Sequence, residues 1–153
     1  MSSEFSLPTQ LPMIRLLGVA FDHFLTEHAR RVAAAGYADI RPGHGCVFGG
    51  IDPENGSRLT DLADRAMMTK QTVGEVVSDL EKRGYVERLP DPEDGRAKII
   101  RLTTKGREVY LTGWRLNKEL EEEWAGRFGE DRVVALREAL ELVHAERFGT
   151  VPV

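Results

Sequence analysis

The stretch TKQTVGEVVSDLEKRG, residues 69–84, predicts a helix with two unlike faces. Thr69 is a good N-cap residue, and Gly84 suits the position just beyond the last helical turn. At about 100° per residue, the apolar side chains project within roughly 60° of one direction. These side chains are Val73, Val76, Val77 and Leu80. The opposite direction carries polar side chains: Gln71, Glu75, Ser78 and Lys82. One face is therefore suited to a core and the other to solvent or to a polar partner.

A shorter helix is expected directly before this one. Residues 52–57 form a polar turn cluster, and Thr60 then offers an N-cap for a helix from Asp61 to about Ala66. Only two residues separate the end of that helix from Thr69. Two helices joined by so tight a turn are typical of a helix-turn-helix.

A charged hairpin is predicted after Gly84. Residues 85–89 and 97–102 favour two strands, and the pair Asp94-Gly95 between them favours a tight reversal. Cations cluster on the strands and at their tip: Arg88, Arg96, Lys98 and Arg101. Short helix, tight turn, longer helix and hairpin, in that order, indicate a winged helix-turn-helix.

Long amphipathic helices are expected on both sides of this unit. Apolar residues recur at steps of three and four from Leu11 to near Gly36, with Pro12 in the first turn. Two further helices run from Thr103 or Thr104 to Phe148, divided near Gly129. A glycine-rich segment, 36–56, predicts a short helix between loops. These apolar stripes exceed what a small winged domain can cover, so we expect a homodimer; packing within one chain is the alternative.

The expected fold class is mainly α with a small β-hairpin wing (α+β), with dimerisation helices at both ends of the chain. We expect a dimerisation helix in residues 1–36, the DNA-binding winged domain in 37–103 and dimerisation helices in 104–153.

The overall charge argues against a general binder of polyanions. Of 153 residues, 21 are Lys or Arg and 25 are Asp or Glu, which gives a net charge of −4. Between Arg58 and Lys105, ten cations face nine anions, so any nucleic-acid surface must be local. The single cysteine, Cys46, suits a reducing compartment. No apolar stretch is long enough to span a bilayer, and Glu4 stands where an export signal favours a cation, so we expect a cytoplasmic protein.

The polar face of helix 69–84 is suited to the major groove of DNA. Near its N-terminus, Lys70, Gln71 and Thr72 bring a cation, an amide and a hydroxyl, which contact phosphates or base edges in protein–DNA complexes. Gly74 permits a close backbone approach. Glu75 is a candidate for base specificity, because a carboxylate accepts a hydrogen bond from the cytosine amino group. A solvated face is the plain alternative.

Five segments together resemble the MarR family of bacterial transcriptional regulators: TDLADR (60–65), TKQTV (69–73), LEKRGYVER (80–88), DPEDGRAK (91–98) and LTTKGR (102–107). The match is specific from about Arg58 to Arg107, although Met67 stands in the turn where many members have glycine. The resemblance implies a homodimeric regulator, in our expectation a repressor, with one recognition helix from each subunit in successive major grooves of a palindromic operator.

The resemblance also implies where DNA and ligand bind. The DNA contacts fall on the recognition helix and the wing: Thr69, Lys70, Gln71, Thr72, Gly74, Glu75, Ser78 and Arg96, to which the wing cation Lys98 is added. A small ligand, often aromatic in this family, would bind between the dimerisation helices and the winged domain. Its expected neighbours are Phe24, His28, Arg41, His44 and Phe48.

Other functions are less well supported by the sequence. GHGCVFG, residues 43–49, has Phe48 where a phosphate-binding glycine loop needs its third glycine. His44 and Cys46 could bind a metal or form a base and nucleophile, but no second ligand pair follows at zinc spacing. We therefore expect that the protein is not an enzyme, has no catalytic residue and binds no metal or cofactor. The remaining alternative is a winged module that binds protein instead of DNA.

Overall fold

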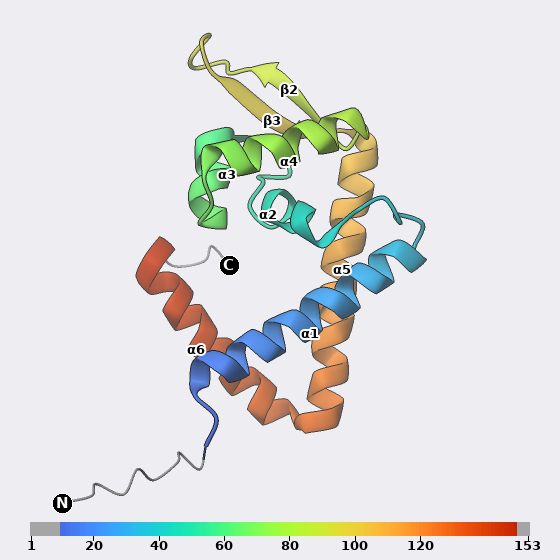
Figure 1. Ribbon diagram of the computed structural model, residues 1–153, viewed down its shortest axis with the longest axis vertical. Helices are drawn as coiled ribbons and strands as arrows, with labels where there is room; N and C mark the ends of the chain where they lie inside the picture. Colours follow the sequence, from blue (N-terminus) through green and yellow to red (C-terminus); the bar gives the residue numbers. More distant parts are fainter. Residues whose placement is uncertain (1–9, 150–153) are drawn as a thin grey trace, which may run out of the picture.

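Six α-helices, one 3-10 turn and a three-stranded sheet account for the regular structure of residues 10–149, which the computed structural model describes (Figure 1). Glu4 lies outside the described residues. The helices are α1 (Met13–Ala34), α2 (Gly45–Phe48), α3 (Leu59–Ala66), α4 (Lys70–Lys82), α5 (Thr104–Phe128) and α6 (Glu130–Phe148). The 3-10 turn η1 (Pro42–His44) precedes α2, and the strands are β1 (Ser57–Arg58), β2 (Val86–Pro90) and β3 (Lys98–Leu102).

The winged helix-turn-helix is confirmed. Helices α3 and α4 are joined by a short turn, and β2 and β3 form an antiparallel hairpin in which Val86 faces Leu102 and Pro90 faces Lys98. The sheet has a third strand that we did not predict, because β1 has only two residues and no alternation to read. It pairs with β3, which gives the order β1-β3-β2.

The short strand β1 explains one wrong prediction. Thr60 does not cap α3, because the helix begins at Leu59 and Arg58 is its N-cap. Arg58 is held in an extended conformation by pairing with Ile99, so the helix starts as soon as the strand ends. In contrast, Thr69 is confirmed as the cap of α4, since its Oγ1 accepts a hydrogen bond from the Thr72 amide at 3.1 Å.

The apolar face of α4 lies in the main core. Val73, Val77 and Leu80 are fully buried, whereas Val76 is half-buried. Their neighbours in the core come from α2, α3, α5 and the sheet: Val47, Leu62, Tyr85, Val86, Ile100, Leu102 and Val109. At about 1.5–3 kcal/mol for each large aliphatic side chain, this burial is the main stabilisation of α4 on the domain.

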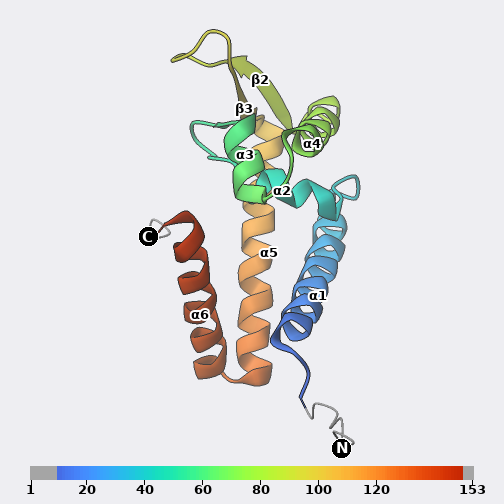
Figure 2. The ribbon, with the colours of Figure 1, turned by 60° about the vertical axis from the view of Figure 1, so that its left-hand side comes forward.

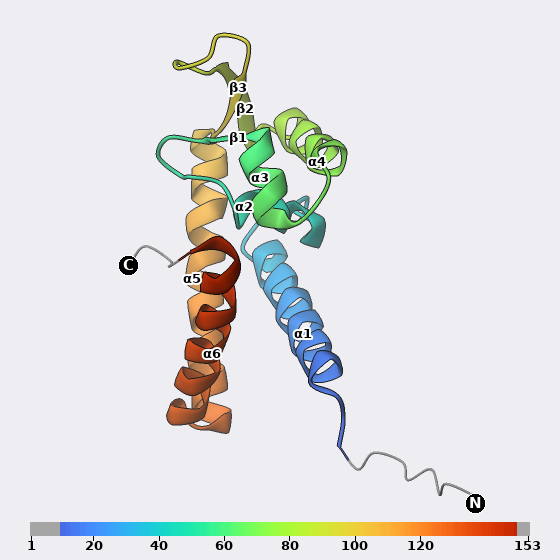
Figure 3. The same cartoon turned by 90° about the vertical axis from the view of Figure 1, so that its left-hand side faces the viewer.

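The long helices leave the winged domain in one direction. Helix α5 starts beneath the sheet and runs away from it, with α1 and α6 on its two sides (Figures 2 and 3). Pro12 is the N-cap of α1 rather than a residue of its first turn. Of the predicted stripe only Val32 is buried, and α6 has no buried residue. Figures 1 and 2 show the wing at the opposite end of the molecule.

The turn between α3 and α4 contains a strained residue. Met67 has φ 54° and ψ 38°, the left-handed conformation that closes α3, and Met68 donates its amide to Ala63 O at 3.0 Å. Met67 is the one non-glycine residue with positive φ in the described part of the chain. Its side chain is 67% exposed, so little packing offsets the strain.

We expect Met67→Gly to raise the free energy of unfolding by about 1 kcal/mol, because glycine adopts this conformation without a Cβ clash. Urea unfolding at one fixed protein concentration measures the change. Met68→Gly is the matched control: Met68 has negative φ, so the same replacement there should destabilise the fold. Equal destabilisation by both substitutions would contradict the role assigned to Met67.

Candidate DNA-binding surface and ligand cavity

The first turn of α4 presents an uncompensated cation. Lys70, Gln71, Thr72 and Glu75 are exposed, and Lys70 forms no hydrogen bond or ion pair with the described part of the chain. The Thr69 side chain is used locally, because its hydroxyl also lies 2.8 Å from that of Thr72. Burial of the valines directs Gln71 and Glu75, on the opposite side of the helix, outward, and Lys70 is exposed because it lies at the N-terminal end of α4. The geometry is that of a helix able to present its N-terminal residues to a groove.

The remaining expected contacts on α4 are partly occupied. Glu75 accepts a hydrogen bond from Gln71 Nε2 at 3.4 Å, so these two side chains form one polar pair. Ser78 is half-buried: its hydroxyl donates to Gly74 O at 2.8 Å and accepts from Arg88 at 3.1 Å. At Gly74 a Cβ would contact Leu59 of α3. The structure therefore turns Ser78 and Gly74 toward the domain rather than outward.

A buried carboxylate, that of Asp91, fixes the start of the loop that joins β2 to β3. Asp91 is 4% exposed, accepts the Glu93 amide at 2.8 Å and accepts Arg58 Nε at 2.6 Å. The backbone donor and the guanidinium lower the pKa of Asp91. Arg88 is likewise paired, with Glu81. These arginines position the wing and are not free for another anion.

Two other wing cations stay exposed. Arg96 and Lys98 form no side-chain hydrogen bond or ion pair with the residues that the structure describes. The tip is shaped by Asp94, whose carboxylate accepts the Arg96 amide at 3.1 Å and whose carbonyl accepts the Ala97 amide at 2.9 Å. Figure 1 shows the hairpin and α4 at the same end of the molecule. Lys70, Arg96 and Lys98 thus supply cations from both parts of this end.

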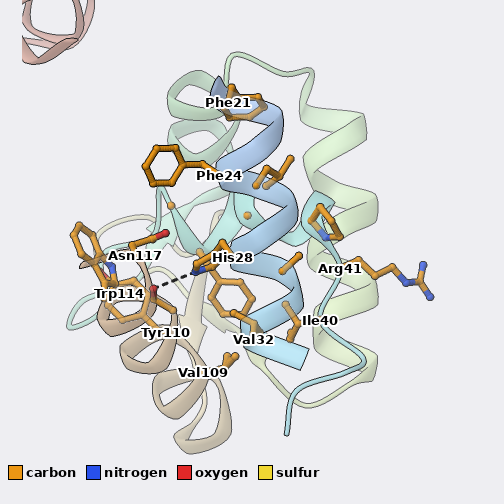
Figure 4. A pocket seen from close by; sticks show the side chains of 17 residues that line it. Phe21, Phe24, His28, Val32, Ile40, Arg41, Val109, Tyr110, Trp114 and Asn117 are labelled. Atoms are coloured by element: carbon orange, nitrogen blue, oxygen red, sulfur yellow. Dashed lines mark hydrogen bonds between the residues drawn. The ribbon is translucent and has the colours of Figure 1, made fainter. Parts of the chain in front are cut away.

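A cavity of about 300 Å³ lies where the long helices meet the winged domain (Figure 4). Four of the five expected ligand neighbours line it: Phe24, His28, Arg41 and Phe48. In Figure 4 the guanidinium of Arg41 extends away from the other labelled side chains. His28 donates from Nε2 to Gly113 O, 3.1 Å away, which joins α1 to α5 in the wall. The lining is mostly apolar, as small-molecule sites usually are.

Helix α5 supplies a wall that we did not predict from the sequence. Its lining residues are Val109, Tyr110, Gly113, Trp114 and Asn117. They follow one another at steps of one and three, which makes a stripe on α5 that starts at the core residue Val109 and runs beside the core stripe. That spacing was the available signal, but it could not show that α1 lies opposite.

His44 does not line the cavity. It is 3% exposed, its Nδ1 accepts the Arg41 amide at 3.1 Å, and its Nε2 lies 2.9 Å from Asp79 Oδ2 on α4. Asp79 also accepts Arg83 Nε at 2.9 Å. Hydrogen bonds from Arg83 and then from His44 lower the pKa of Asp79 to about 2.

A second polar link joins the same regions. Arg83 donates to Asp39 O at 3.3 Å, and Tyr85 donates its hydroxyl to the Asp39 carboxylate at 2.7 Å. Burial, followed by this carboxylate, raises the pKa of Tyr85, and the Tyr85 hydroxyl lowers the pKa of Asp39. The loop after α1 is therefore bonded to the C-terminal end of α4.

The geometry does not support Cys46 as an activated nucleophile. Both ring nitrogens of His44 are used by Arg41 and Asp79, and half-burial raises the pKa of the Cys46 thiol.

Within residues 10–149, no group of three His, Cys, Asp or Glu side chains could hold a metal ion. None of the helices in that range combines the length and the apolar character that a membrane span requires.

Sequence comparison identifies relatives of this chain. Residues 38–97 match the sequence profile described as "MarR family". Transcriptional regulator HosA of Escherichia coli O111:H- is 28% identical over 100 residues, 65% of this chain and 74% of that protein. HosA of Escherichia coli O157:H7 is 28% identical over 85 residues, 56% of this chain, and the aligned part spans 63% of that protein, just under two thirds. The family and these relatives are transcriptional regulators rather than enzymes.

Solved structures share the fold at low identity. MarR from E. coli, in its apo form, has a TM-score of 0.71 at 22% identity, covering 88% of this chain and 98% of that one. The S. aureus MepR–DNA complex has a TM-score of 0.72 at 19% identity, covering 90% and 99%. NadR in complex with 4-hydroxyphenylacetate has a TM-score of 0.70 at 20% identity, covering 90% and 96%.

We expect Asp79→Asn to flatten the acid dependence of stability. The pKa of Asp79 is lowered from 3.8 to about 2 in the folded chain, so its stabilising contribution is complete above about pH 4 and is lost as the pH falls through 2. The variant should be less stable at pH 6 and should lose less stability between pH 4 and pH 2. Thermal unfolding at each pH measures this. Glu93→Gln, at the exposed wing tip, is the control, and an acid dependence identical to wild type in Asp79→Asn would refute the assignment.

Proposed function

Because the chain belongs to the MarR family of transcriptional regulators, we propose that it is a cytoplasmic homodimeric repressor of a palindromic operator, with DNA affinity altered by a small aromatic ligand. The observation that carries the proposal is the first turn of α4. Gln71 and Glu75 are exposed on the side opposite the buried valines, and the unpaired Lys70 is exposed at the N-terminal end of the helix, at the same end of the molecule as the wing with its two free cations.

In the proposed complex, α4 lies in the major groove and the wing contacts the backbone or the minor groove. Lys70, Arg96 and Lys98 neutralise phosphates, and the Gln71–Glu75 pair faces the base edges. Thr69 and Thr72 stay near the backbone as the cap of the helix. Ser78 and Gly74 hold α4 on the domain and contribute to the DNA surface only indirectly.

The homodimer is supported by apolar surface on the long helices. Ile14 on α1 is 81% exposed and Leu142 on α6 is 70% exposed. Leu11, Leu16 and Val19 of the α1 region also lie in a shallow groove with Trp124 and Phe128 of α5. A second copy covers this surface in the proposal and sets the distance between the two recognition helices.

The cavity supports a ligand of one aromatic ring. Its volume of about 300 Å³ is at the lower end of small-molecule sites, and Phe24, Phe48 and Tyr110 give it aromatic walls. His28, Asn117 and the Tyr110 hydroxyl supply the polar groups that would orient the ring. The NadR complex shows that this fold holds 4-hydroxyphenylacetate in another protein.

We expect Lys70→Ala and Arg96→Ala each to weaken binding to the duplex by roughly tenfold at low salt. Selection from random duplexes first supplies that duplex and shows whether its half-sites are symmetric and about one helical turn apart. Fluorescence anisotropy over a salt series then gives the slope of log affinity against log salt, which should fall by about one for each lost phosphate contact. Lys118→Ala, an exposed cation on α5, is the control. Unchanged affinity and slope in both variants would remove these residues from the DNA surface.

We expect Ile14→Glu and Leu142→Glu to raise the dimer dissociation constant by about 100-fold or more, because each places an unpaired carboxylate in an apolar interface. Sedimentation velocity over a concentration series measures the change. Met68→Glu makes the same apolar-to-acid replacement in the turn before α4 and should leave the dimer intact. Wild type that sediments as a monomer would exclude the dimer itself.

A further inference from the structure

The connection 39–45 has one side in the cavity and the other on α4. The residues that line the cavity from this connection are Ile40, Arg41, Pro42 and Gly45. The residues that bond the C-terminal part of α4 and its cap are Asp39 and His44, which do not line the cavity. The two sets are interspersed within seven consecutive residues, so a displacement of one set displaces the other.

The bonds of His44 join the two sides through one rigid ring. Its Nδ1 accepts the backbone amide of Arg41, a cavity residue, at 3.1 Å. Nδ1 therefore carries no hydrogen, Nε2 does, and Nε2 donates to Asp79 Oδ2 at 2.9 Å. With 3% exposure, the ring has no water to replace either partner. Breaking one of these bonds leaves a buried polar group unpaired, which is costly.

The hydrogen bond between His44 and Asp79 also restricts the position of the first turn of α4. It lies on the same continuous helix as Lys70 and Gln71, and α4 spans 13 residues. Asp79 also accepts Arg83 Nε, and Arg83 returns to Asp39 O at 3.3 Å. The connection therefore holds the C-terminal part of α4 and its cap at two points, His44 and Asp39.

We propose that His44 is the positioning residue that couples the cavity to the recognition helix. A ring bound in the cavity displaces Arg41 and η1, and His44 then either releases Asp79 or turns α4 with it. A regulatory role for this coupling rests on the proposed function. The mechanical coupling itself is independent of DNA and is tested without DNA.

Two substitutions separate the bonds of His44. His44→Gln places an amide N–H near the position of Nε2 and keeps the donor to Asp79. His44→Asn is too short for Asp79 but keeps an acceptor for the Arg41 amide. Hydrogen–deuterium exchange of α4 amides should be about tenfold faster in His44→Asn and within about twofold of wild type in His44→Gln. Equal exchange rates of α4 in the two variants would overturn the proposal.

A tethered ring then replaces the unidentified ligand. In a Cys46→Ser background, Asn117→Cys puts a thiol on the cavity wall, and benzyl methanethiosulfonate attaches a phenyl group, with attachment counted by mass. The same label on Lys118→Cys, beside the cavity but not lining it, is the control. Attachment at position 117 should change α4 exchange threefold or more with His44, and by less than that both with His44→Gln, which lacks the acceptor for the Arg41 amide, and with His44→Asn, which lacks the donor to Asp79.

The outcomes distinguish this proposal from the proposed function. An identical response in His44→Asn, or no response in any protein, overturns coupling through His44. A response that depends on His44, together with no preference for any duplex in the selection experiment, retains the coupling and rejects the operator function. A route through the long helices would appear as exchange changes in α1 and α6 that are indifferent to position 44.

Discussion

Burial of one face of α4 is the constraint on which the functional geometry depends. Val73, Val77 and Leu80 have no exposed surface, and the core around them contains residues of α2, α3, α5 and the sheet. A helix held this way cannot rotate about its axis without exposing two valines and a leucine, at about 1.5–3 kcal/mol each. The polar side, with Gln71 and Glu75, is therefore presented in one direction, and Lys70 is exposed at the N-terminal end of the helix. The direction of the polar side follows from the packing of the valines.

The junction between the wing and α5 depends on a close backbone approach. A Cβ at Gly106 would lie 1.8 Å from Tyr85 O, so no other residue fits where α5 begins. Thr103 caps α5 by accepting the Gly106 amide at 3.0 Å, and its hydroxyl donates to Gly84 O at 2.6 Å. The segment LTTKGR, residues 102–107, thus attaches the end of β3 and the start of α5 to the residues that follow α4. The start of α5 is therefore in direct backbone contact with the residues that join α4 to β2.

Local features of the fold were predictable, and contacts between distant segments were not. The Thr69 cap, the two-faced pattern of α4 and the hairpin each depend on residues a few positions apart, and the structure confirms them. Thr60 failed as a cap because β1 pairs with a strand about 40 positions later. The α5 wall of the cavity and the bond between His44 and Asp79 require knowledge of which helices lie opposite. Ser78 appeared available on a helical wheel, but Arg88 of the next strand occupies it.

The arrangement of polar groups explains why a cavity so far from the exposed face of α4 can still influence it. No residue of α3 or α4 lines the cavity, so a ligand there touches the recognition helix only through other segments. The long helices meet α4 through the apolar core, whose contacts are not directional. A hydrogen bond between a buried ring and a carboxylate has a fixed length and angle, and it therefore transmits a displacement as a definite movement. Among the described contacts between the cavity wall and α4, the path through Arg41, His44 and Asp79 has this directional character at every step.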